Sequence, residues 1–367
     1  MISKTTPAAR LVGMQLKNGW SVEELLSYGQ TFEDGEGTGG TFSVSYRVVR
    51  GAEVAFLKAF DLDRVIVLYG EDKMMETLQR ETTAFLNEQG LNVLCVKNRM
   101  RQVVKIVDYG EVLVPQQPGD RINVVHYMIM ELASHGDIRG HLQGAEPQDF
   151  ASKFCYLKDV ALGIKQLHSA KVSHQDIKPS NVMVFEKNAA KIGDLGRASI
   201  QGKDGVYDSW VVAGDQSYAP PEQLYGITLT EWFDRRERCD VYQFGSLICF
   251  TIFGLTVNEI LSRKVPKEQA PSAWGGSGSS YELALPFLQK AFSEGMLEIR
   301  TAIPDWARDK VMSLIDQSAN PDYKMRGSRR VLGKQSVASL GLDRFISELD
   351  RLRVEAEKHA IIRRKAI

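Results

Sequence analysis

The chain of 367 residues is long enough for one large domain or two smaller ones. Apolar residues make up 43% and charged residues 25%, as in ordinary globular proteins, and 46 basic side chains balance 46 acidic ones, so the net charge indicates no nucleic-acid partner. The spacing of the four cysteines fits neither a metal site nor a disulfide-rich secreted protein, which predicts free thiols in a reducing cytoplasm: Cys95, Cys155, Cys239 and Cys249.

Residues 16–60 predict a β-rich beginning, after an N-terminal stretch with no apolar run long enough for a signal peptide. The glycines of 37–44, GTGGTFSV, would let a turn of backbone approach phosphate groups, although a plain glycine-rich turn has the same composition. The apolar alternation around this stretch predicts a half-buried strand: Phe42, Val44, Tyr46 and Val48. A second strand, 53–60, carries Lys58 inside an apolar run, so its amine needs either a buried partner or an exposed edge.

Residues 71–89 predict a highly charged helix. Its apolar positions are Met74, Leu78, Phe85 and Leu86. The polar region 91–126 that follows contains two short predicted strands and a loop, at 103–107, 112–114 and 115–121. An extended stretch, 126–137, comes next, and an apolar helical pattern over 149–171 leads out of it.

The stretch 172–196 concentrates polar chemistry within about two dozen residues. Two carboxylates, an amine and an amide at these offsets are the groups that handle the phosphates of a nucleotide and a metal ion. A polar hairpin of an unrelated α/β protein is the alternative. The residues concerned are His174, Asp176, Lys178, Asn181 and Asp194.

Residues 241–261 are apolar nearly all round, which predicts either a membrane-spanning helix or a helix buried in a large core. Polar residues lie within and directly before this run, and its place in the family pattern given below favours the core: Arg238, Asp240, Gln243, Ser246, Asn258 and Glu259. Helices around 284–317 follow, and 342–367 predicts a charged helix with a basic tip on the surface.

In combination, these segments resemble the eukaryotic-type (Hanks-type) protein kinases over roughly residues 20–350. HQDIKPSN at 174–181 is similar to H-R-D-L-x-x-x-N, DLG at 194–196 to D-F-G, PPE at 220–222 to A-P-E, DVYQFG at 240–245 to D-x-x-x-F-G, and 37–44 to G-x-G-x-x-G-x-V with Phe42 at the third glycine. The compact form looks most like bacterial relatives, by analogy alone. The resemblance implies an α+β fold with a β-rich small lobe and a mainly helical large lobe.

The resemblance also implies domain boundaries and cofactors. The boundaries are an N-terminal extension at 1–19, a small lobe at 20–132, a large lobe at 133–341 and a charged C-terminal helix at 342–367. The cofactors are ATP and Mg²⁺, with Mn²⁺ as the other candidate metal.

Roles follow for the residues that match the motifs. Asp176 would position the hydroxyl that attacks, Lys178 would neutralise the moving phosphoryl group, and Asn181 and Asp194 would hold the metal. The implied ATP-binding set is Gly37, Gly39, Val44, Lys58, Glu81, Met130, Glu131, Ala133 and Met183, with Glu81, or else Glu76, as the ion-pair partner of Lys58. The implied structural set is His174, Glu222, Asp240 and Arg326, in which Arg326 anchors Glu222 and Asp240 accepts hydrogen bonds from the catalytic-loop backbone.

Besides Phe42 and Leu195, three departures from the family pattern bear on regulation, substrate choice and the adenine pocket. Gln175 replaces the arginine that usually pairs with a phosphorylated activation segment, so we expect a weak dependence on phosphorylation there. Asp215 stands where serine/threonine-specific members usually carry threonine, which blurs the choice of substrate hydroxyl. Phe56 replaces a small residue expected above the adenine.

The expected function is ATP- and Mg²⁺-dependent transfer of the γ-phosphoryl group to serine or threonine of a protein substrate. Two alternatives remain open, a small-molecule kinase of the same superfamily and a catalytically silent ATP-binding scaffold. For a regulatory protein partner, the candidate places are residues 91–126 and the C-terminal helix. The sequence indicates neither a membrane segment nor a nucleic-acid site.

Overall fold

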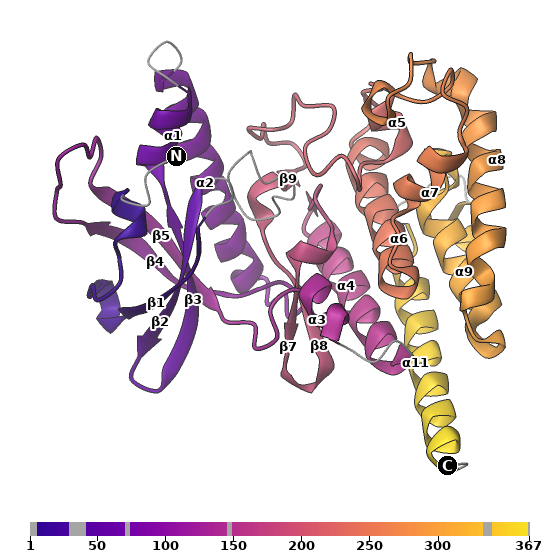
Figure 1. Cartoon of the computed structure of the whole chain (residues 1–367), viewed down its shortest axis with the longest axis horizontal. Helices are drawn as coiled ribbons and strands as arrows, with labels where there is room; N and C mark the ends of the chain where they lie inside the picture. Colours follow the sequence, from indigo (N-terminus) through magenta and orange to yellow (C-terminus); the bar gives the residue numbers. More distant parts are fainter. Residues whose placement is uncertain (1–5, 29–41, 70–73, 145–148, 333–339, 366–367) are drawn as a thin grey trace. The chain divides into compact units, whose positions relative to one another are not determined.

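The structure, a computed structural model, describes residues 6–28, 42–69, 74–144, 149–332 and 340–365. The chain divides into two compact units, residues 1–134 and 135–367. The first is built on a β-sheet and the second is mainly helical (Figure 1). The predicted α+β class, with one β-rich and one helical part, is confirmed.

The first unit contains an antiparallel sheet of five strands in the order β1-β2-β3-β5-β4. The strands are β1 (Ser21–Tyr28), β2 (Ser43–Arg50), β3 (Glu53–Phe60), β4 (Ile106–Leu113) and β5 (Val124–Glu131). Alternate residues of β2 and β3 enter the buried core: Val44, Tyr46, Val48, Ala55, Leu57 and Ala59. Because neighbouring residues of a strand point to opposite faces, Lys58 lies on the other face of the sheet.

Residues of the predicted N-terminal extension belong to this same core. Ala8, Leu11 and Leu16 are buried in it. Arg10 forms a bidentate contact with Asp120, with Nη2 2.6 Å from Oδ2 and Nη1 3.0 Å from Oδ1. The described part of 1–19 therefore packs against the sheet as part of the unit.

Two helices, α1 (Leu62–Tyr69) and α2 (Met74–Lys97), complete the first unit. Helix α2 continues eight residues beyond the predicted end at residue 89. The two short strands predicted at 103–107 and 112–114 are wrong, since one strand, β4, takes their place. Asp108 and Glu111 interrupt the apolar pattern, but β4 is an edge strand that presents alternate residues to solvent, so it accommodates them.

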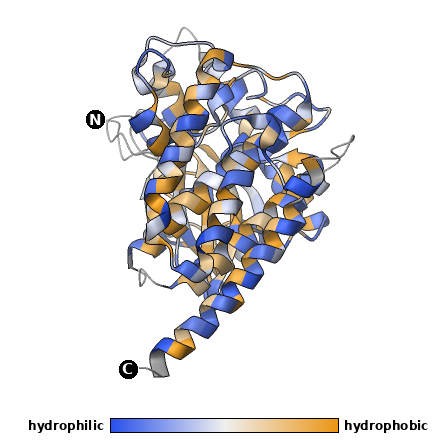
Figure 2. Ribbon diagram, turned by 90° about the vertical axis from the view of Figure 1, so that its right-hand side faces the viewer, coloured by the Kyte–Doolittle hydropathy of each residue, from blue (hydrophilic) through white to orange (hydrophobic). Residues whose placement is uncertain are grey.

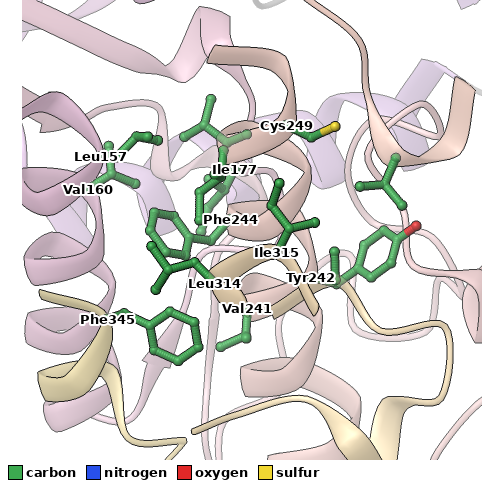
Figure 3. Close-up of a cluster of buried hydrophobic side chains, with 14 of the residues drawn as sticks. Leu157, Val160, Ile177, Val241, Tyr242, Phe244, Cys249, Leu314, Ile315 and Phe345 are labelled. Carbon is green, nitrogen blue, oxygen red and sulfur yellow. The ribbon is translucent and has the colours of Figure 1, made fainter. Parts of the chain in front are cut away.

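The core of the second unit lies among four helices, α4 (Phe150–Ser169), α6 (Arg238–Phe253), α9 (Asp305–Ala319) and α11 (Leu342–Lys365). Figure 3 shows Leu157 of α4, Phe244 of α6, Leu314 of α9 and Phe345 of α11 in one apolar cluster. Gly245 allows the close approach of α6 and α9, because a Cβ there would lie 2.4 Å from Ser318 Oγ. The long apolar run is thus divided between α6 and the next helix, with α6 in the core.

Helix α11 lies along α4 and is only partly a surface helix. Phe345, Leu349 and Leu352 recur at i, i+4 and i+7, and all three are buried. Figure 2 shows hydrophilic and hydrophobic residues alternating along this helix. The expected surface helix is therefore amphipathic, with one face in the core of the second unit.

The remaining helices of the second unit are α3 (Ile138–Gly144), α5 (Pro221–Leu224), α7 (Val257–Lys264), α8 (Tyr281–Ile299) and α10 (Arg329–Leu332). Within the described ranges no single helix is long and apolar enough to cross a membrane. The segment Phe233–Phe253 and α7 pass that test only when they are taken together, and they are bent by 88°.

Two small hairpin-like sheets position the polar loops of the second unit. Strand β6 (Val172–Ser173) pairs with β9 (Ser199–Ile200), and β7 (Val182–Phe185) pairs with β8 (Ala189–Ile192). The loop between β6 and β7 carries Asp176, Lys178 and Asn181, and Asp194 is the second residue after β8. Strand pairing therefore brings the beginning and the end of the polar stretch 172–196 together.

Candidate active site

Lys58, on β3, forms a buried ion pair with Glu88 on α2. Its Nζ lies 2.8 and 2.9 Å from the two carboxylate oxygens, and the two side chains are 14% and 6% exposed. The predicted partner Glu81 and the second choice Glu76 are both wrong. Glu81 contacts its neighbour Arg80 at 3.0 Å, and Glu76 is exposed.

The register of α2 explains this error. Glu81 and Glu88 are seven residues apart, so they share a helix face within about 20° but lie about 10 Å apart along the axis. Phe85 stacks on Phe60 of β3 at a centroid distance of 5.0 Å. Because Phe60 is two residues after Lys58, this stack places the glutamate after Phe85, and not the one before it, beside the amine.

The other predicted nucleotide contacts of the first unit lie on or after its central strands. Val44 is buried on β2, and Met130 on β5 pairs in register with Phe56 on β3. Gly37 and Gly39 lie outside the described residues.

Glu131, the last residue of β5, is hydrogen-bonded to Lys105, the residue before β4. The carboxylate of Glu131 accepts a hydrogen bond of 2.7 Å from the backbone N–H of Lys105, and the Glu131 N–H donates to the Lys105 carbonyl at 3.0 Å. Within the described residues, Ala133 makes no backbone hydrogen bond. Its N–H and C=O are the groups that remain for the edge of a planar ligand.

In the second unit, Asp240 in the first turn of α6 anchors the polar loop through hydrogen bonds. It is fully buried and accepts hydrogen bonds of 2.8 Å from the backbone N–H groups of His174 and Gln175, from Ser173 Oγ and from His168 Nε2. Burial raises the pKa of Asp240, but the hydrogen bond and charge of His168 and the loop amides outweigh it and lower the pKa overall. Asp240 is therefore a firmly ionised anchor for the loop backbone.

Gln243, one turn further along α6, adds two hydrogen bonds that the sequence did not indicate. Its Oε1 accepts from Ile177 N–H at 2.9 Å, and its Nε2 donates to the Gln175 carbonyl at 2.8 Å. The loop backbone thus hydrogen-bonds both the oxygen and the nitrogen of this side-chain amide. Gln175 adopts a left-handed conformation with φ 68°, which these bonds on either side of it hold in place.

The Asp176 carboxylate is the centre of the loop. Asn181 Nδ2 donates to its Oδ2 at 3.0 Å and to its backbone carbonyl at 2.8 Å, and Lys178 Nζ lies 3.1 Å from the same Oδ2. The other oxygen, Oδ1, accepts from Asp215 N–H at 2.8 Å. The structure thus brings together three of the predicted residues, Asp176, Lys178 and Asn181.

The charges of this group interact strongly. Burial raises the pKa of Asp176, Asp194 raises it further, and Lys178 opposes the rise. Burial acts to lower the pKa of Lys178, but the charges of Asp176 and Asp215 outweigh it and raise the pKa overall. The amine is therefore cationic, and it faces two carboxylates, with Asp215 Oδ2 3.5 Å away.

Gly193, directly before Asp194, ties the two halves of the stretch together. Its N–H donates to the Asn181 carbonyl at 2.8 Å, and its carbonyl contacts His174 Nε2 at 2.9 Å. Because Asp176 N–H points to Nδ1 of the same ring at 3.2 Å, Nδ1 is the acceptor and Nε2 carries the proton. His174 is thus a structural link between the two loops.

Asn181 and Asp194 fit the oxygen chemistry of Mg²⁺ or Mn²⁺. The Nδ2 group of Asn181 is used by Asp176, and its Oδ1 accepts no hydrogen bond from the described residues. Asp194 has φ 57°, and its Oδ1 accepts from Gly196 N–H at 3.3 Å. Since the described residues include no cluster of three His, Cys, Asp or Glu suited to a metal, phosphate and water oxygens would complete the shell, as Mg²⁺ prefers.

Gly214 and Asp215 bring the segment after Asp194 against the loop. A Cβ on Gly214 would lie 2.3 Å from the Gln175 carbonyl oxygen and 2.7 Å from Asp176 Oδ1, so the approach requires glycine. Burial acts to raise the pKa of Asp215, but the hydrogen bond from Ser217 and the charge of Lys178 lower it overall. Asp215 is therefore an anion beside the Lys178 amine.

The predicted pair of Glu222 and Arg326 is present in the structure. Nη1 and Nη2 of Arg326 each lie 2.7 Å from one carboxylate oxygen of Glu222, and both side chains are almost fully buried. The guanidinium also stacks over Tyr242 of α6 at 4.6 Å from the ring centroid. Met183, on β7, lies opposite Asp137 in an isolated bridge.

The chain is also similar to known proteins. A family profile described as "Protein kinase domain" matches residues 35–326. The chain is 27% identical over 312 residues to calmodulin-binding receptor-like cytoplasmic kinase 3 of Arabidopsis thaliana, covering 81% of this chain and 54% of that protein. It is 30% identical over 192 residues to an Aurora kinase of Debaryomyces hansenii, covering 52% and 40%.

A third relative is the probable serine/threonine-protein kinase PBL4 of Arabidopsis thaliana, 32% identical over 161 residues that cover 43% of this chain and 35% of that protein. The chain therefore spans about half the length of the first of these relatives and less of the other two.

Proposed function

The chain belongs to the protein kinase domain family, and we propose on that premise that it transfers the γ-phosphoryl group of ATP to serine or threonine hydroxyls of proteins. The observation that carries the proposal is the set of contacts made by Asp176 with Lys178 and Asn181. These hold a base, a cation and a metal ligand in one loop, which is what phosphoryl transfer requires.

In the proposed mechanism, Asp176 accepts the hydrogen bond of the substrate hydroxyl and orients its oxygen for attack. Lys178 stabilises the negative charge of the phosphoryl group in transit. Asn181 and Asp194 hold the divalent metal, which neutralises phosphate charge when it is bound. Little covalent chemistry is needed from the protein, so positioning and charge supply most of the rate enhancement.

The first unit supplies the groups proposed to bind the nucleotide. Lys58, oriented by Glu88, would bind the α and β phosphates, and Glu88 replaces Glu81 as its ion-pair partner. The other residues of the proposed ATP-binding set are Gly37, Gly39, Val44, Met130, Glu131, Ala133 and Met183. Asn181 and Asp194 are the proposed metal ligands.

Preference for serine and threonine is the finer part of the proposal. It is supported by Lys178-Pro179 after the proposed catalytic aspartate and by the PBL4 relative, which is named a probable serine/threonine-protein kinase. A small-molecule kinase and a silent scaffold remain alternatives. Against the first stands the buried Glu222–Arg326 pair, which anchors the end of an activation segment that substrate proteins would contact.

Regulation and location are proposed on narrower grounds. Gln175, in place of an arginine, supports a weak dependence on activation-segment phosphorylation. The relative that is 27% identical is named a calmodulin-binding receptor-like cytoplasmic kinase, which supports a cytoplasmic location and a regulatory protein partner. The candidate contact regions are still 91–126 and the exposed face of α11.

The test is phosphate transfer from [γ-³²P]ATP with Mg²⁺ to a generic basic protein. We expect Asp176→Ala and Asp194→Ala each to lower transfer at least roughly 100-fold, because each removes a group that acts in the transition state. ATP binding should survive better in Asp176→Ala. Asp204→Ala, at an exposed carboxylate, is the matched control and should transfer normally.

The alternatives give different results in the same assay. Label on a small metabolite but on no protein would identify a small-molecule kinase. Thermal stabilisation by ATP without any labelled product would identify a silent scaffold. Full turnover by either aspartate variant would overturn the site assignment.

A further inference from the structure

Arg236 is a buried arginine that none of the motifs accounts for. It lies in a π-helical turn, Phe233–Glu237, directly before α6, and is 2% exposed. Its Nη1 donates to Gln175 Oε1 at 2.8 Å, and its Nη2 donates to Asp208 Oδ1 at 2.9 Å and to the Asp208 carbonyl at 3.0 Å. One guanidinium therefore connects the catalytic loop to the segment that follows Asp194.

Asp208 is the organising residue of its part of that segment. Besides Arg236, its carboxylate accepts hydrogen bonds from Ser199 Oγ on β9 and from Gly205 N–H. The Asp208 carbonyl also accepts from Arg235. The carboxylate thus joins a strand, a loop turn and the π-helical turn before α6, although it is itself 25% exposed.

A buried guanidinium needs a compensating anion, because it cannot lose its charge at ordinary pH. Burial and the neighbouring Arg235 lower the pKa of Arg236, and Asp208 opposes them. Asp208 is the carboxylate in hydrogen-bond contact with Arg236 among the described residues. The ion pair is therefore a requirement of the buried charge, not an incidental surface contact.

Gln175 is suited to this arrangement in a way that arginine is not. Its Oε1 accepts from Arg236, while its Nε2 donates to Ser173 Oγ at 2.6 Å and to the Arg236 carbonyl at 3.1 Å. Arginine has donors only, so at position 175 it would leave Arg236 without this acceptor and add a second cation. The departure from the family pattern at Gln175 and the buried Arg236 thus explain each other.

We propose that Asp208, Arg236 and Gln175 form a permanent clasp that positions the activation segment, residues 194–222, for catalysis without phosphorylation. A carboxylate fixed in the chain supplies the anion that a phosphate would otherwise provide. The segment returns to the catalytic loop at Gly214 and Asp215, whose N–H bonds Asp176, so the clasp holds the stretch between two attachment points. This inference rests on the proposed kinase function and concerns its positioning residues.

The activity experiment uses the full chain after phosphatase treatment, with intact mass confirming the absence of phosphate. We expect the wild type to remain active and Asp208→Asn to lose roughly tenfold in kcat/KM for the protein substrate, with the Kd for ATP unchanged. Asp208→Glu, which keeps the anion, should recover most of the loss. The matched control is Asp204→Asn, four residues earlier and exposed, which should behave as wild type.

A second measurement does not depend on activity. In hydrogen exchange, Asp208→Asn should raise the exchange rate of amides in 199–215, while Asp204→Asn should not. If the wild type transfers no phosphate, the proposed function fails, yet this exchange pattern still supports the clasp. Unchanged exchange and unchanged kcat/KM in Asp208→Asn, or loss of wild-type activity on dephosphorylation, would overturn it.

Discussion

Both carboxylate oxygens of Asp176 are engaged by the chain itself. Asp215 N–H holds Oδ1, and Asn181 and Lys178 hold Oδ2. A side chain held on both sides keeps one rotamer, so it presents its lone pairs in a fixed direction. Several charges lie close together as a result, and the Lys178 amine is shared between the carboxylates of Asp176 and Asp215.

Replacing Asp215 tests that sharing. We expect Asp215→Asn to raise kcat by roughly threefold, because a carboxylate 3.5 Å from Lys178 offsets part of the charge available to the phosphoryl group. The backbone N–H that bonds Asp176 is kept in this variant. The measurement is steady-state transfer at saturating ATP.

Ser217→Ala is the control for this substitution. It removes the hydroxyl that hydrogen-bonds Asp215 but leaves the carboxylate charge in place, so kcat should change little. A fall in kcat for a folded Asp215→Asn variant would instead mean that Asp215 holds Lys178 in position.

At the scale of elements, helix α2 illustrates how packing selects one of several equivalent residues. Glu81 and Glu88 lie on nearly the same face of a 24-residue helix. The stacked pair of Phe60 and Phe85 fixes the position of the helix along β3, and only Glu88 then meets Lys58.

The two glutamates form a matched pair for an experiment. We expect Glu88→Gln to lower kcat/KM for ATP by roughly tenfold or more, because Lys58 loses the anion that orients it in a partly buried site. Glu81→Gln should change it less than twofold. Equal effects of the two substitutions in steady-state kinetics, with both proteins folded by circular dichroism, would contradict the register given by the structure.

At the scale of the whole molecule, the proposed catalytic loop depends on charges buried in the helical core of the second unit. Asp240 joins α6 to α4 through His168, and it joins α6 to residues 173–175 through four further donors. The ion pair of Arg326 and Glu222 likewise joins two segments that lie 104 positions apart in the sequence. Loop geometry and stability of the unit are therefore coupled.

We expect Asp240→Asn to lower the free energy of unfolding by about 3 kcal/mol at pH 7, because charge-assisted hydrogen bonds in the core are lost. The pKa of Asp240 is lowered in the folded chain, so the folded state binds this proton less tightly than the unfolded state. Its contribution is complete above the unfolded pKa of about 4 and is lost as the pH falls through the lower, folded pKa.

Urea unfolding as a function of pH measures this contribution. The difference between wild type and Asp240→Asn should be constant near neutral pH and narrow below pH of about 4. Asp234→Asn, which breaks a partly exposed ion pair with Arg238, is the control and should cost at most about 1 kcal/mol. A difference that widens in acid would exclude the assigned direction of the pKa shift.

Features that depend on residues close together in the sequence could be predicted, and features that depend on contacts with distant elements could not. The α+β division, the strand faces of β2 and β3, and the loop that carries Asp176 and Asn181 depend on periodicity and on spacings of a few residues. Three features could not be predicted, because packing against distant elements overrides local composition. They are the length of α2, the single strand β4 in place of two, and the buried face of α11.

Motif spacing in the sequence was enough to identify which chemical groups are present and in what order: Lys58, Asp176, Lys178, Asn181 and Asp194. Tertiary structure alone decided the long-range partners, Glu88 for Lys58 and Asp208 with Gln175 for Arg236. The physical reason is that several carboxylates satisfy the same charge equally well in sequence, and only the packing of rigid helices and strands determines which one comes within 3 Å.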